Sequence, residues 1–302
     1  MRQRASKVRL LVLSAGTGAS NNLIRSLRAS GSSCFIAGCH HDRFVLGKSS
    51  AERNFLVPAV SDARYLLALR SIIREQRIHL VIPDSDLDVV AISELRRRLR
   101  CRVFLPSPRA IHLCQDKYAL ATFLKQRGIP SPVTLPISST TRIGGLFRRL
   151  APNSVLWCRI RFRSASAGAL PVHTVAQARS WIEYWRDVRG VPVKAFTLSE
   201  FLPGRDYCLQ SLWHRGKLVL AKTAERLTYF GAGNAPSGMS STPALAKTVY
   251  EPPVFEVCEA AIRAIDAKAN GIFCIDLKER ADGTPCITEI NPGRFVMVTN
   301  VY

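Results

Sequence analysis

The stretch GIFCIDLKERADGTPCITEINPGRF, residues 271–295, places two runs of apolar and β-branched residues on either side of Asp282-Gly283. Asp-Gly is a preferred pair for the two-residue type I′ turn, which joins neighbouring antiparallel strands. Within each strand, alternate side chains then point to the same face. The stretch therefore predicts a β-hairpin with a two-residue loop.

This hairpin would bring two carboxylates together. Counting back from a two-residue loop sets Asp276 directly opposite Glu289, and Asn291 shares the face of Glu289. Facing carboxylates repel by up to about 1 kcal/mol unless a positive charge lies between them. A hard divalent cation takes carboxylate and amide oxygens as ligands, so this face is a candidate metal site. An ordinary surface hairpin, in which Lys278 neutralises Asp276, is the alternative that spacing leaves open.

The first part of the chain alternates strand-like with helix-like segments. The strand-like runs are Leu10–Leu13, Cys34–Ala37, His79–Ile82 and Val103–Leu105, and the helix-like runs are Leu23–Leu27, Ala63–Arg74 and Val89–Leu99. This alternation is typical of a parallel sheet with helices packed against it. We therefore expect an α/β domain over residues 1–110, which ends near Pro106 and Pro108.

The rest of the chain divides into two further parts. Residues 116–127 have the pattern of an amphipathic helix, which Gly128 and Pro130 end. A strand, a loop rich in Ser and Ala, and a tryptophan-rich helix follow, and the composition shifts again before the last group of strands. We expect a central domain over 111–197 and a C-terminal domain over 198–302, with α+β character towards the end.

A glycine turn near the start offers one place for a nucleotide. In LLVLSAGTGASNNLIRSL, residues 10–27, Gly16 and Gly18 match the first two glycines of the dinucleotide-binding pattern, but Asn21 stands at the third. The acidic residue that this pattern needs about 20 positions further on has no clear counterpart. We favour a tight structural turn, and a Rossmann-type NAD(P) oxidoreductase is the less favoured alternative.

Three aspartates follow a predicted strand in VIPDSDLDVV. Asp84, Asp86 and Asp88 lie where α/β sheets commonly bind ligands. The residues that would complete a calcium loop are missing, since Val89 stands where glycine is needed. A solvated loop and a substrate contact are the two readings of this segment.

Composition limits the classes of partner. The 302 residues carry a formal charge of +21, but no aromatic residues interleave with the basic runs as a base-stacking platform would need. Nucleic acid is therefore not expected, and the excess of arginine suits an anionic substrate. Nine scattered cysteines fit reduced thiols in the cytoplasm. We expect neither an export signal nor a membrane span, and a homodimer stays open.

Four segments together resemble the ATP-grasp superfamily of carboxylate–amine ligases. The pattern Asp276-x12-Glu289-x-Asn291, followed by Pro-Gly-Arg, resembles the metal-binding signature of this superfamily. Asp116-Lys117, VLWCRIRFRSASAG (155–168) and SEFLPGRD (199–206) resemble, in turn, the opening of its central domain, its phosphate-covering loop and its adenine-binding hinge. The carbamoyl-phosphate-synthetase-like branch, with a Rossmann-like domain before a two-lobed ATP-grasp fold, fits best.

The resemblance implies a role for each matching residue. The Mg²⁺ ligands are Asp276, Glu289 and Asn291, and the cations at the transferring phosphate are Arg159 and Arg294. The nucleotide contacts are Lys117, Arg159, Ser164, Ser166, Gly168, Glu200, Phe201, Leu202 and Asp206. Arg161 competes with Arg159 for the phosphate role, and the loop keeps one glycine, Gly168.

The implied activity is an ATP-dependent carboxylate–amine, or carboxylate–thiol, ligase. In this family, ATP with Mg²⁺ (or Mn²⁺) phosphorylates a carboxylate, and an amine displaces phosphate from the acyl phosphate, which leaves ADP and phosphate. The partners are small-molecule carboxylate and amine substrates, for which an anionic acid is an option. The altered loop and the short segment after Asn291 keep a second alternative open, a nucleotide-binding protein without catalysis.

Overall fold

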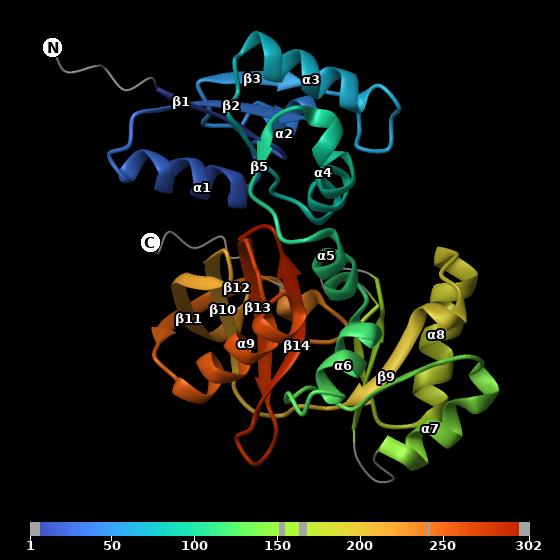
Figure 1. Ribbon diagram of the computed structural model, residues 1–302. Helices are drawn as coiled ribbons and strands as arrows, with labels where there is room; N and C mark the ends of the chain where they lie inside the picture. Colours follow the sequence, from blue (N-terminus) through green and yellow to red (C-terminus); the bar gives the residue numbers. More distant parts are fainter. Residues whose placement is uncertain (1–6, 151–154, 163–167, 239, 241, 296–302) are drawn as a thin grey trace, which may run out of the picture.

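Three β-sheets follow one another along the chain in the computed structural model, which describes residues 7–150, 155–162, 168–238, 240 and 242–295 (Figure 1). The first sheet is parallel and the other two are antiparallel. The expected mixed α/β architecture is therefore confirmed. Within the described segments, every helix is too short or too polar to cross a membrane.

The first sheet has the strand order β3-β2-β1-β4-β5 with all strands parallel. Its strands are β1 (Val8–Val12), β2 (Cys34–His40), β3 (Arg53–Leu56), β4 (Leu80–Ile82) and β5 (Arg102–Val103). Its helices are α1 (Gly18–Ala29), α2 (Arg43–Leu46), α3 (Tyr65–Glu75) and α4 (Asp86–Leu99). The chain order reverses between β1 and β4, which is the switch point of a doubly wound sheet.

Both faces of this sheet are covered, which explains the continuous apolar run of β1. Leu10 and Val12 pack with Ile24 of α1 on one face. Leu11 and Leu13 pack with α3 and α4 on the other. A strand that is buried on both faces needs apolar residues at every position rather than at alternate ones.

The space beside the glycine turn after β1 is filled by other residues of the chain. Gly16 has φ +94°, and a Cβ there would lie 1.9 Å from the carbonyl oxygen of Val45. Asn21, at the position of the missing glycine, donates from its side chain to the carbonyl of Lys48 at 3.0 Å and accepts from Ser50 N. The turn is thus packed against its neighbouring loop, which favours the structural reading over a dinucleotide site.

The central sheet has the order β6-β9-β7-β8 and carries its helices on one face. Its strands are β6 (Thr134–Pro136), β7 (Leu156–Ile160), β8 (Leu170–Val172) and β9 (Phe196–Glu200). The covering helices are α7 (Ile143–Leu150) and α8 (Val175–Arg189), with short 3-10 turns at η1 (Thr140–Arg142) and η2 (Val193–Ala195). A capping box of Thr174 and Gln177 starts α8, and Gly190, with φ +64°, ends it.

The C-terminal sheet has the order β12-β11-β10-β13-β14. Its strands are β10 (Asp206–His214), β11 (Lys217–Tyr229), β12 (Pro243–Val249), β13 (Gly271–Glu279) and β14 (Pro285–Pro292), with η3 (Ala232–Asn234) after β11. Helix α9 (Pro252–Ile265) packs on one face, and α6 (Lys117–Lys125) joins the same core. The other face is open to the site described below.

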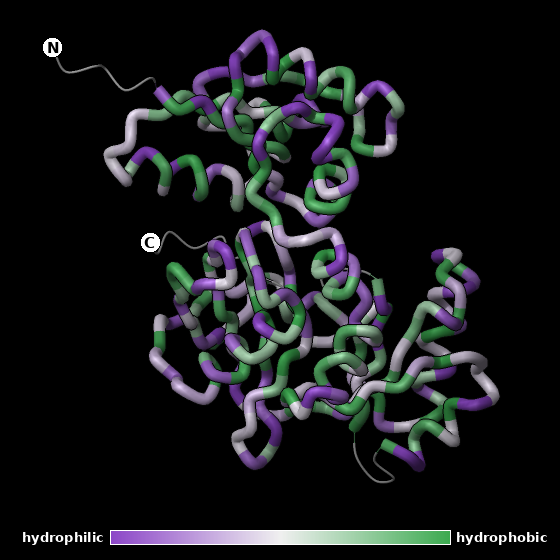
Figure 2. Tube along the Cα trace, viewed as in Figure 1, coloured by the Kyte–Doolittle hydropathy of each residue, from purple (hydrophilic) through white to green (hydrophobic). Residues whose placement is uncertain are grey.

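Helices α5 (Pro108–Gln115) and α6 both contact β14, and α5 lies where the chain passes from the first sheet to the C-terminal sheet (Figure 1). The segment from 111 to about 129 therefore contributes to the C-terminal core, although it precedes the central sheet in the chain. The domain boundaries at residues 110 and 197 stay a prediction. The tip of the β13–β14 hairpin extends away from the sheet and is hydrophilic (Figure 2).

Candidate active site

The last hairpin places its two acids as the sequence predicts. Asp276 of β13 pairs directly with Glu289 of β14, and Cys274 pairs with Asn291 two residues away. The amide of Asn291 donates to Glu289 Oε1 at 3.3 Å. The side chains of Asp276 and Glu289 are 14% and 23% exposed, so both carboxylates are largely removed from water. The paired carboxylates are confirmed.

The turn that produces this pairing is not the predicted one. Arg280 N donates to Thr284 O at 3.0 Å and Gly283 N donates to Arg280 O at 3.1 Å, so the loop has three residues, with Gly283 at φ +83°. The register then shifts between Asp276 and Leu277, which leaves Thr288 unpaired as a β-bulge. The extra loop residue shifts the pairing by one residue, and the bulge shifts it back. The predicted two-residue turn is therefore wrong, but the predicted pairing of the two acids is right.

Asp276 is neutralised from the neighbouring strands. Arg226 of β11 donates to Asp276 Oδ1 at 2.6 Å and also to Asp206 of β10 at 3.2 Å. Burial raises the pKa of Asp276 to about 6 against the attraction of Arg226, and the charge of Glu289 adds to the rise. Near neutral pH the carboxylate is ionised, but its burial makes the charged form less favourable than it is in water. Lys278, which the surface-hairpin alternative requires, does not pair with Asp276 at salt-bridge distance in the described structure; Arg226 does.

Glu289 is in the opposite electrostatic situation. Lys117 Nζ lies 3.2 Å from its Oε2. Burial alone would raise the pKa of Glu289, but Lys117 and Arg159 outweigh burial and hold this pKa at about 2. The two facing acids are therefore stabilised differently, since one is pushed towards protonation and the other is firmly ionised.

Lys117 is positioned by the start of α6. Asp116 is the N-cap, and its carboxylate accepts from the backbone N–H groups of Tyr118 and Ala119. The same carboxylate pairs with Arg161 at 2.5 Å. Arg161 is thereby committed to the helix cap, which leaves Arg159 as the β7 arginine that faces the acids. Which of the two arginines binds phosphate stays a prediction, and the geometry favours Arg159.

Arg159 is buried and close to both carboxylates. Its Nη2 donates to the carbonyl oxygen of the bulged Thr288 at 2.9 Å. Burial lowers its pKa, while the charges of Glu289 and Asp276 oppose that shift. Its Nε is buried and has no hydrogen-bond partner among the residues that the structure describes. A buried guanidinium with an unsatisfied N–H is prepared for an anionic ligand.

These groups line a cavity of about 140 Å³ between the central and C-terminal sheets. Eight of the residues predicted for the site contribute to its wall: Lys117, Arg159, Glu200, Phe201, Leu202, Asp206, Asp276 and Glu289. The cavity combines an apolar end, which includes Trp157 and Phe201, with a strongly charged end. Such a combination suits a ligand with a flat apolar part and an anionic part.

The predicted hinge forms the apolar end of the cavity. Glu200 closes β9, where its carboxylate pairs with Arg280 at 2.6 Å and accepts from Val133 N at 2.8 Å. Leu202 is 5% exposed, and the rings of Phe201 and Trp157 lie 6.4 Å apart. Both carboxylate oxygens of Glu200 are therefore engaged within the protein.

Among the described residues, three that were predicted for the site are not part of the cavity wall: Gly168, Asn291 and Arg294. Gly168 has φ +71°, and its carbonyl accepts from Trp181 Nε1 at 3.0 Å, while the next residue lines the cavity. Ser164 and Ser166 lie outside the described residues. Arg294 binds Asp86 of α4, with Nη2–Oδ1 at 2.7 Å. The described structure thus directs Arg294 to the first domain rather than to the charged end of the cavity.

The aspartates after β4 do not form a solvated loop. Ser85 caps α4, and Asp84 and Asp88 are buried. Burial raises the pKa of Asp84 to about 7, although Arg294 and Thr17 oppose the rise. Asp88 accepts from Ser14 Oγ at 2.6 Å. The solvated-loop reading is therefore wrong, and this cluster joins the switch point of the first sheet to the segment after β14.

Sequence reasoning missed several residues of the cavity wall. The most important are Arg226 and Tyr229 of β11, with Trp157, Ser199 and Thr288. Tyr229 OH forms a short hydrogen bond to Asp206, which Arg226 also binds. The hairpin turn between β10 and β11 was predictable, but a bulge between Leu212 and Trp213 shifts its register by one residue. Without that bulge Glu225, not Arg226, would face Asp206.

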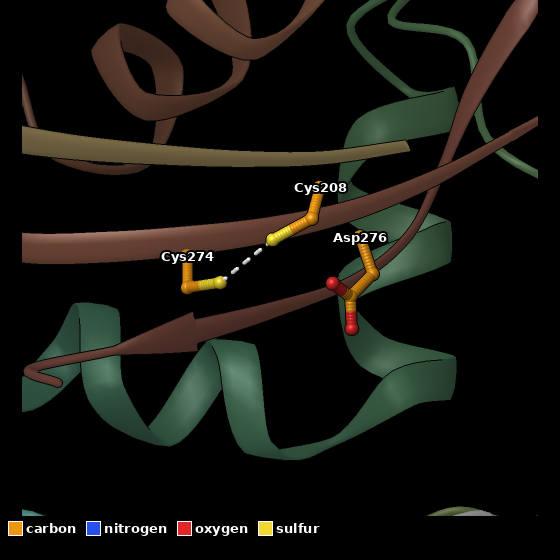
Figure 3. Close-up of side chains that lie close together, drawn as sticks. All are labelled: Cys208, Cys274 and Asp276. Atoms are coloured by element: carbon orange, nitrogen blue, oxygen red, sulfur yellow. Dashed lines mark hydrogen bonds between the residues drawn. The ribbon is translucent and has the colours of Figure 1, made fainter. Parts of the chain in front are cut away.

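Two thiols lie beside Asp276 on the same face of the C-terminal sheet. Cys208 and Cys274 occupy adjacent strands with their Sγ atoms 3.2 Å apart, and the carboxylate of Asp276 lies beside them (Figure 3). The contact with Cys274 and burial raise the pKa of Cys208 well above its ordinary value. Protonated thiols are poor ligands for a hard cation, so the oxygens of Asp276, Glu289 and Asn291 are the matching donors.

The site fits a nucleotide with a divalent cation. Two facing carboxylates and an amide are hard-cation ligands, and each carboxylate has a cation of the chain beside it. The buried Nε atoms of Arg159 and Arg226 have no partner in the described part of the chain. Phosphate oxygens would satisfy them.

Comparisons with known proteins agree with this geometry. No protein-family model and no curated protein sequence matches the chain. The L-amino acid ligase from Bacillus licheniformis matches with a TM-score of 0.68 and 14% identity, over 95% of this chain and 67% of the ligase. The biotin carboxylase–β-γ-ATP complex from Campylobacter jejuni matches with a TM-score of 0.72 and 12% identity, over 97% of this chain and 67% of the carboxylase.

A third structure shows a related complex. It is the biotin carboxylase domain of the Hydrogenobacter thermophilus 2-oxoglutarate carboxylase, a dimer with MgADP, ADP and bicarbonate. It matches with a TM-score of 0.72 and 9% identity, over 96% of this chain and 65% of that chain. The succession of one parallel and two antiparallel sheets, the facing acids of the last hairpin and these likenesses together show that the chain has the ATP-grasp fold.

Proposed function

We propose that the protein is an ATP-dependent ligase that joins a carboxylate to an amine, or to a thiol, and releases ADP and phosphate. The observation that carries this proposal is the Asp276–Glu289 pair, buried in a cavity on which Lys117 and Arg159 converge. Two acids and two cations that are largely removed from water lower the stability of a fold, because each charge loses its hydration. Such a cluster in a cavity is typical of a site where a ligand binds the charged groups. A polyphosphate with its cation matches them in sign and number.

The nucleotide would lie across the cavity. The backbone after Glu200, with Phe201 and Leu202, offers an apolar slot for the adenine, and Asp206 offers a carboxylate for the ribose hydroxyls. Lys117 and Arg159 would bind the phosphates, where they neutralise charge that builds up during transfer.

Asp276, Glu289 and Asn291 would hold Mg²⁺, for which Mn²⁺ can substitute. Bound there, the cation would draw charge from the phosphate oxygens and orient them. Asp276 must be ionised to serve, and Glu289 is ionised throughout the neutral range. The MgADP complex with the same fold supports this assignment.

The substrates would approach from the first domain. Arg294, which follows β14, pairs with Asp86 of α4, so one cation and one anion would face substrates that arrive from this side. In the reaction the γ-phosphate passes to the substrate carboxylate, and the amine then displaces phosphate from the acyl phosphate. Among proteins of this fold, one acts as an L-amino acid ligase and one is bound to bicarbonate, which supports a small carboxylate as the first substrate.

A nucleotide-binding protein without catalysis is the second candidate. The observation that favours it is the Arg294–Asp86 pair, because a cation that is engaged at 2.7 Å is withdrawn from the transferring phosphate. The two candidates share the nucleotide site and differ in turnover.

Product analysis distinguishes these candidates. The protein is incubated with ATP, Mg²⁺ and pairs drawn from the common amino acids, and nucleotides and phosphate are separated and measured. The proposal expects ADP and phosphate in equal amounts with one or more pairs. AMP with pyrophosphate would contradict the acyl-phosphate route, and ATP binding without turnover for any pair would favour the second candidate.

A further inference from the structure

One buried cation bridges the two acids that the proposed function assigns to the ribose and to the metal. Arg226 lies 3.2 Å from Asp206 Oδ1 and 2.6 Å from Asp276 Oδ1. Its side chain is 6% exposed. Arg226 is thus a buried cation shared by two acids of the cavity wall.

The contact at Asp276 has a direct consequence for metal binding. A free divalent cation that approaches the facing carboxylates must displace Arg226 from Asp276 and Lys117 from Glu289. Displacing the guanidinium from Asp276 removes one of its two carboxylate partners, which is unfavourable for a buried cation. A cation that arrives alone brings nothing to replace those contacts.

A nucleotide changes this balance. Ribose hydroxyls can take over Asp206, and phosphate oxygens can accept from the guanidinium, whose Nε has no partner in the described part of the chain. Asp206 also stays anchored when Arg226 leaves, because Tyr229 OH binds its other oxygen. Arg226 can thus exchange both carboxylates for phosphate in a single movement.

We propose that Arg226 keeps the metal site closed to free divalent cations and makes metal entry depend on the nucleotide. This inference rests on the proposed function, since it assumes that Asp276 and Glu289 bind the metal of a nucleotide complex. Arg226 is a positioning residue, because it acts on the metal through Asp276.

The test measures Mn²⁺ binding rather than turnover. Free Mn²⁺ is followed by its electron paramagnetic resonance signal during titration of the intact chain, with and without ADP. Arg226→Met removes the charge and keeps the length of the side chain. Lys217→Met is the matched control, because it removes one charge from the exposed start of the same strand.

In the absence of ADP, Arg226→Met should bind Mn²⁺ at least about tenfold more tightly than the wild type, because a unit charge within about 4 Å still acts strongly at the effective dielectric of a protein. ADP should raise the Mn²⁺ affinity of the wild type more than that of Arg226→Met. Lys217→Met should behave as the wild type in both titrations.

Equal Mn²⁺ affinities of Arg226→Met and wild type without ADP, in a wild type that binds Mn²⁺ with ADP, would overturn this inference alone. A wild type that binds no Mn²⁺ even with ADP would overturn the proposed function and this inference with it. If circular dichroism shows that Arg226→Met is unfolded, Arg226→Lys decides the matter. It keeps the charge but cannot bridge both carboxylates, so a reduced dependence on ADP supports the inference and an unchanged one refutes it.

Discussion

Glu289→Gln and Asp276→Asn remove one charge each from the same facing pair, and we expect them to change stability in opposite directions. Glu289 is held ionised by Lys117 and Arg159, whereas burial opposes the charge of Asp276. Replacing Glu289 should therefore destabilise the ligand-free protein, and replacing Asp276 should leave it equally stable or more stable. Both should lower ATP turnover about 10²-fold or more, because each removes a ligand of the proposed metal.

The magnitudes follow from the two pKa values. A fall from 4.5 to about 2 stabilises the charged form of Glu289 by about 3 kcal/mol, at about 1.36 kcal/mol per pKa unit. A rise from 3.8 to about 6 at Asp276 corresponds to about 3 kcal/mol of the opposite sign. Because the two acids repel each other, each value includes part of the other's charge. We expect measured changes of about 1–3 kcal/mol.

Urea denaturation at pH 7.5, without nucleotide or divalent cation, measures both changes. Glu259→Gln is the matched control, since Glu259 forms an exposed i,i+4 pair with Arg263 on α9. Exposed pairs of this kind contribute about 0.3–0.5 kcal/mol, so this control should change little. ATP turnover is assayed on the same preparations.

Equal stability losses in Glu289→Gln and Asp276→Asn would refute the electrostatic difference between the two acids. Normal turnover in both variants of an otherwise active enzyme would refute the metal site itself. A surface hairpin predicts near-normal turnover with small changes of stability.

Three further predictions concern ligands, pH and the first domain. ATP with Mg²⁺ should raise the melting temperature, whereas NAD(P)H should not, because Gly16 is packed against Val45; a shift with NAD(P)H alone would return the nucleotide to the first sheet. Asp276 is protonated in the folded state below about pH 6, whereas in the unfolded chain it is protonated only near pH 4. The folded state therefore binds more protons between these values, and the free energy of unfolding increases as the pH falls from about 6 to 4. Asp276→Asn should remove that slope from pH-dependent urea midpoints, and kcat/KM for ATP in the wild type should fall on the acid side with a midpoint near 6. Asp86→Asn should release Arg294 and change the KM of the acid or amine substrate while the KM for ATP stays within about twofold; an equal change in both would place Arg294 at the nucleotide.

Periodicity and turn residues predicted the long elements of the fold. The apolar run before Gly16 became β1, buried on both faces, and the predicted tryptophan-rich helix extends over Val175–Arg189. The short elements β3 (Arg53–Leu56) and α2 (Arg43–Leu46) were not predicted. Four residues carry too little periodicity to be distinguished from a loop. β3 forms because it pairs with β2, and the carboxylate of Asp42 caps the first turn of α2.

The charged end of the cavity was only partly predictable, because its cations come from distant parts of the chain. Lys117 follows a helix cap, Arg159 lies in the middle of β7, and Arg226 lies in β11. The resemblance to the ATP-grasp superfamily indicated the first two. Arg226 faces Asp206 only because a β-bulge shifts β10 against β11, and a bulge has no distinct signal in a single sequence.

The bulge at Thr288 shows why the local rule failed at the point where the chemistry is proposed. A regular ladder would use the carbonyl of every second residue for the neighbouring strand, but the bulge leaves Thr288 unpaired. Its carbonyl instead accepts from Arg159 at 2.9 Å, and its hydroxyl donates to the carbonyl of Asp276 at 3.0 Å. The irregularity thus joins the central sheet to the hairpin and fixes Arg159 beside both acids. A regular two-residue hairpin would pair the same carboxylates but would give Arg159 no such anchor, so the departure from the ideal hairpin is what connects the cation to the metal face.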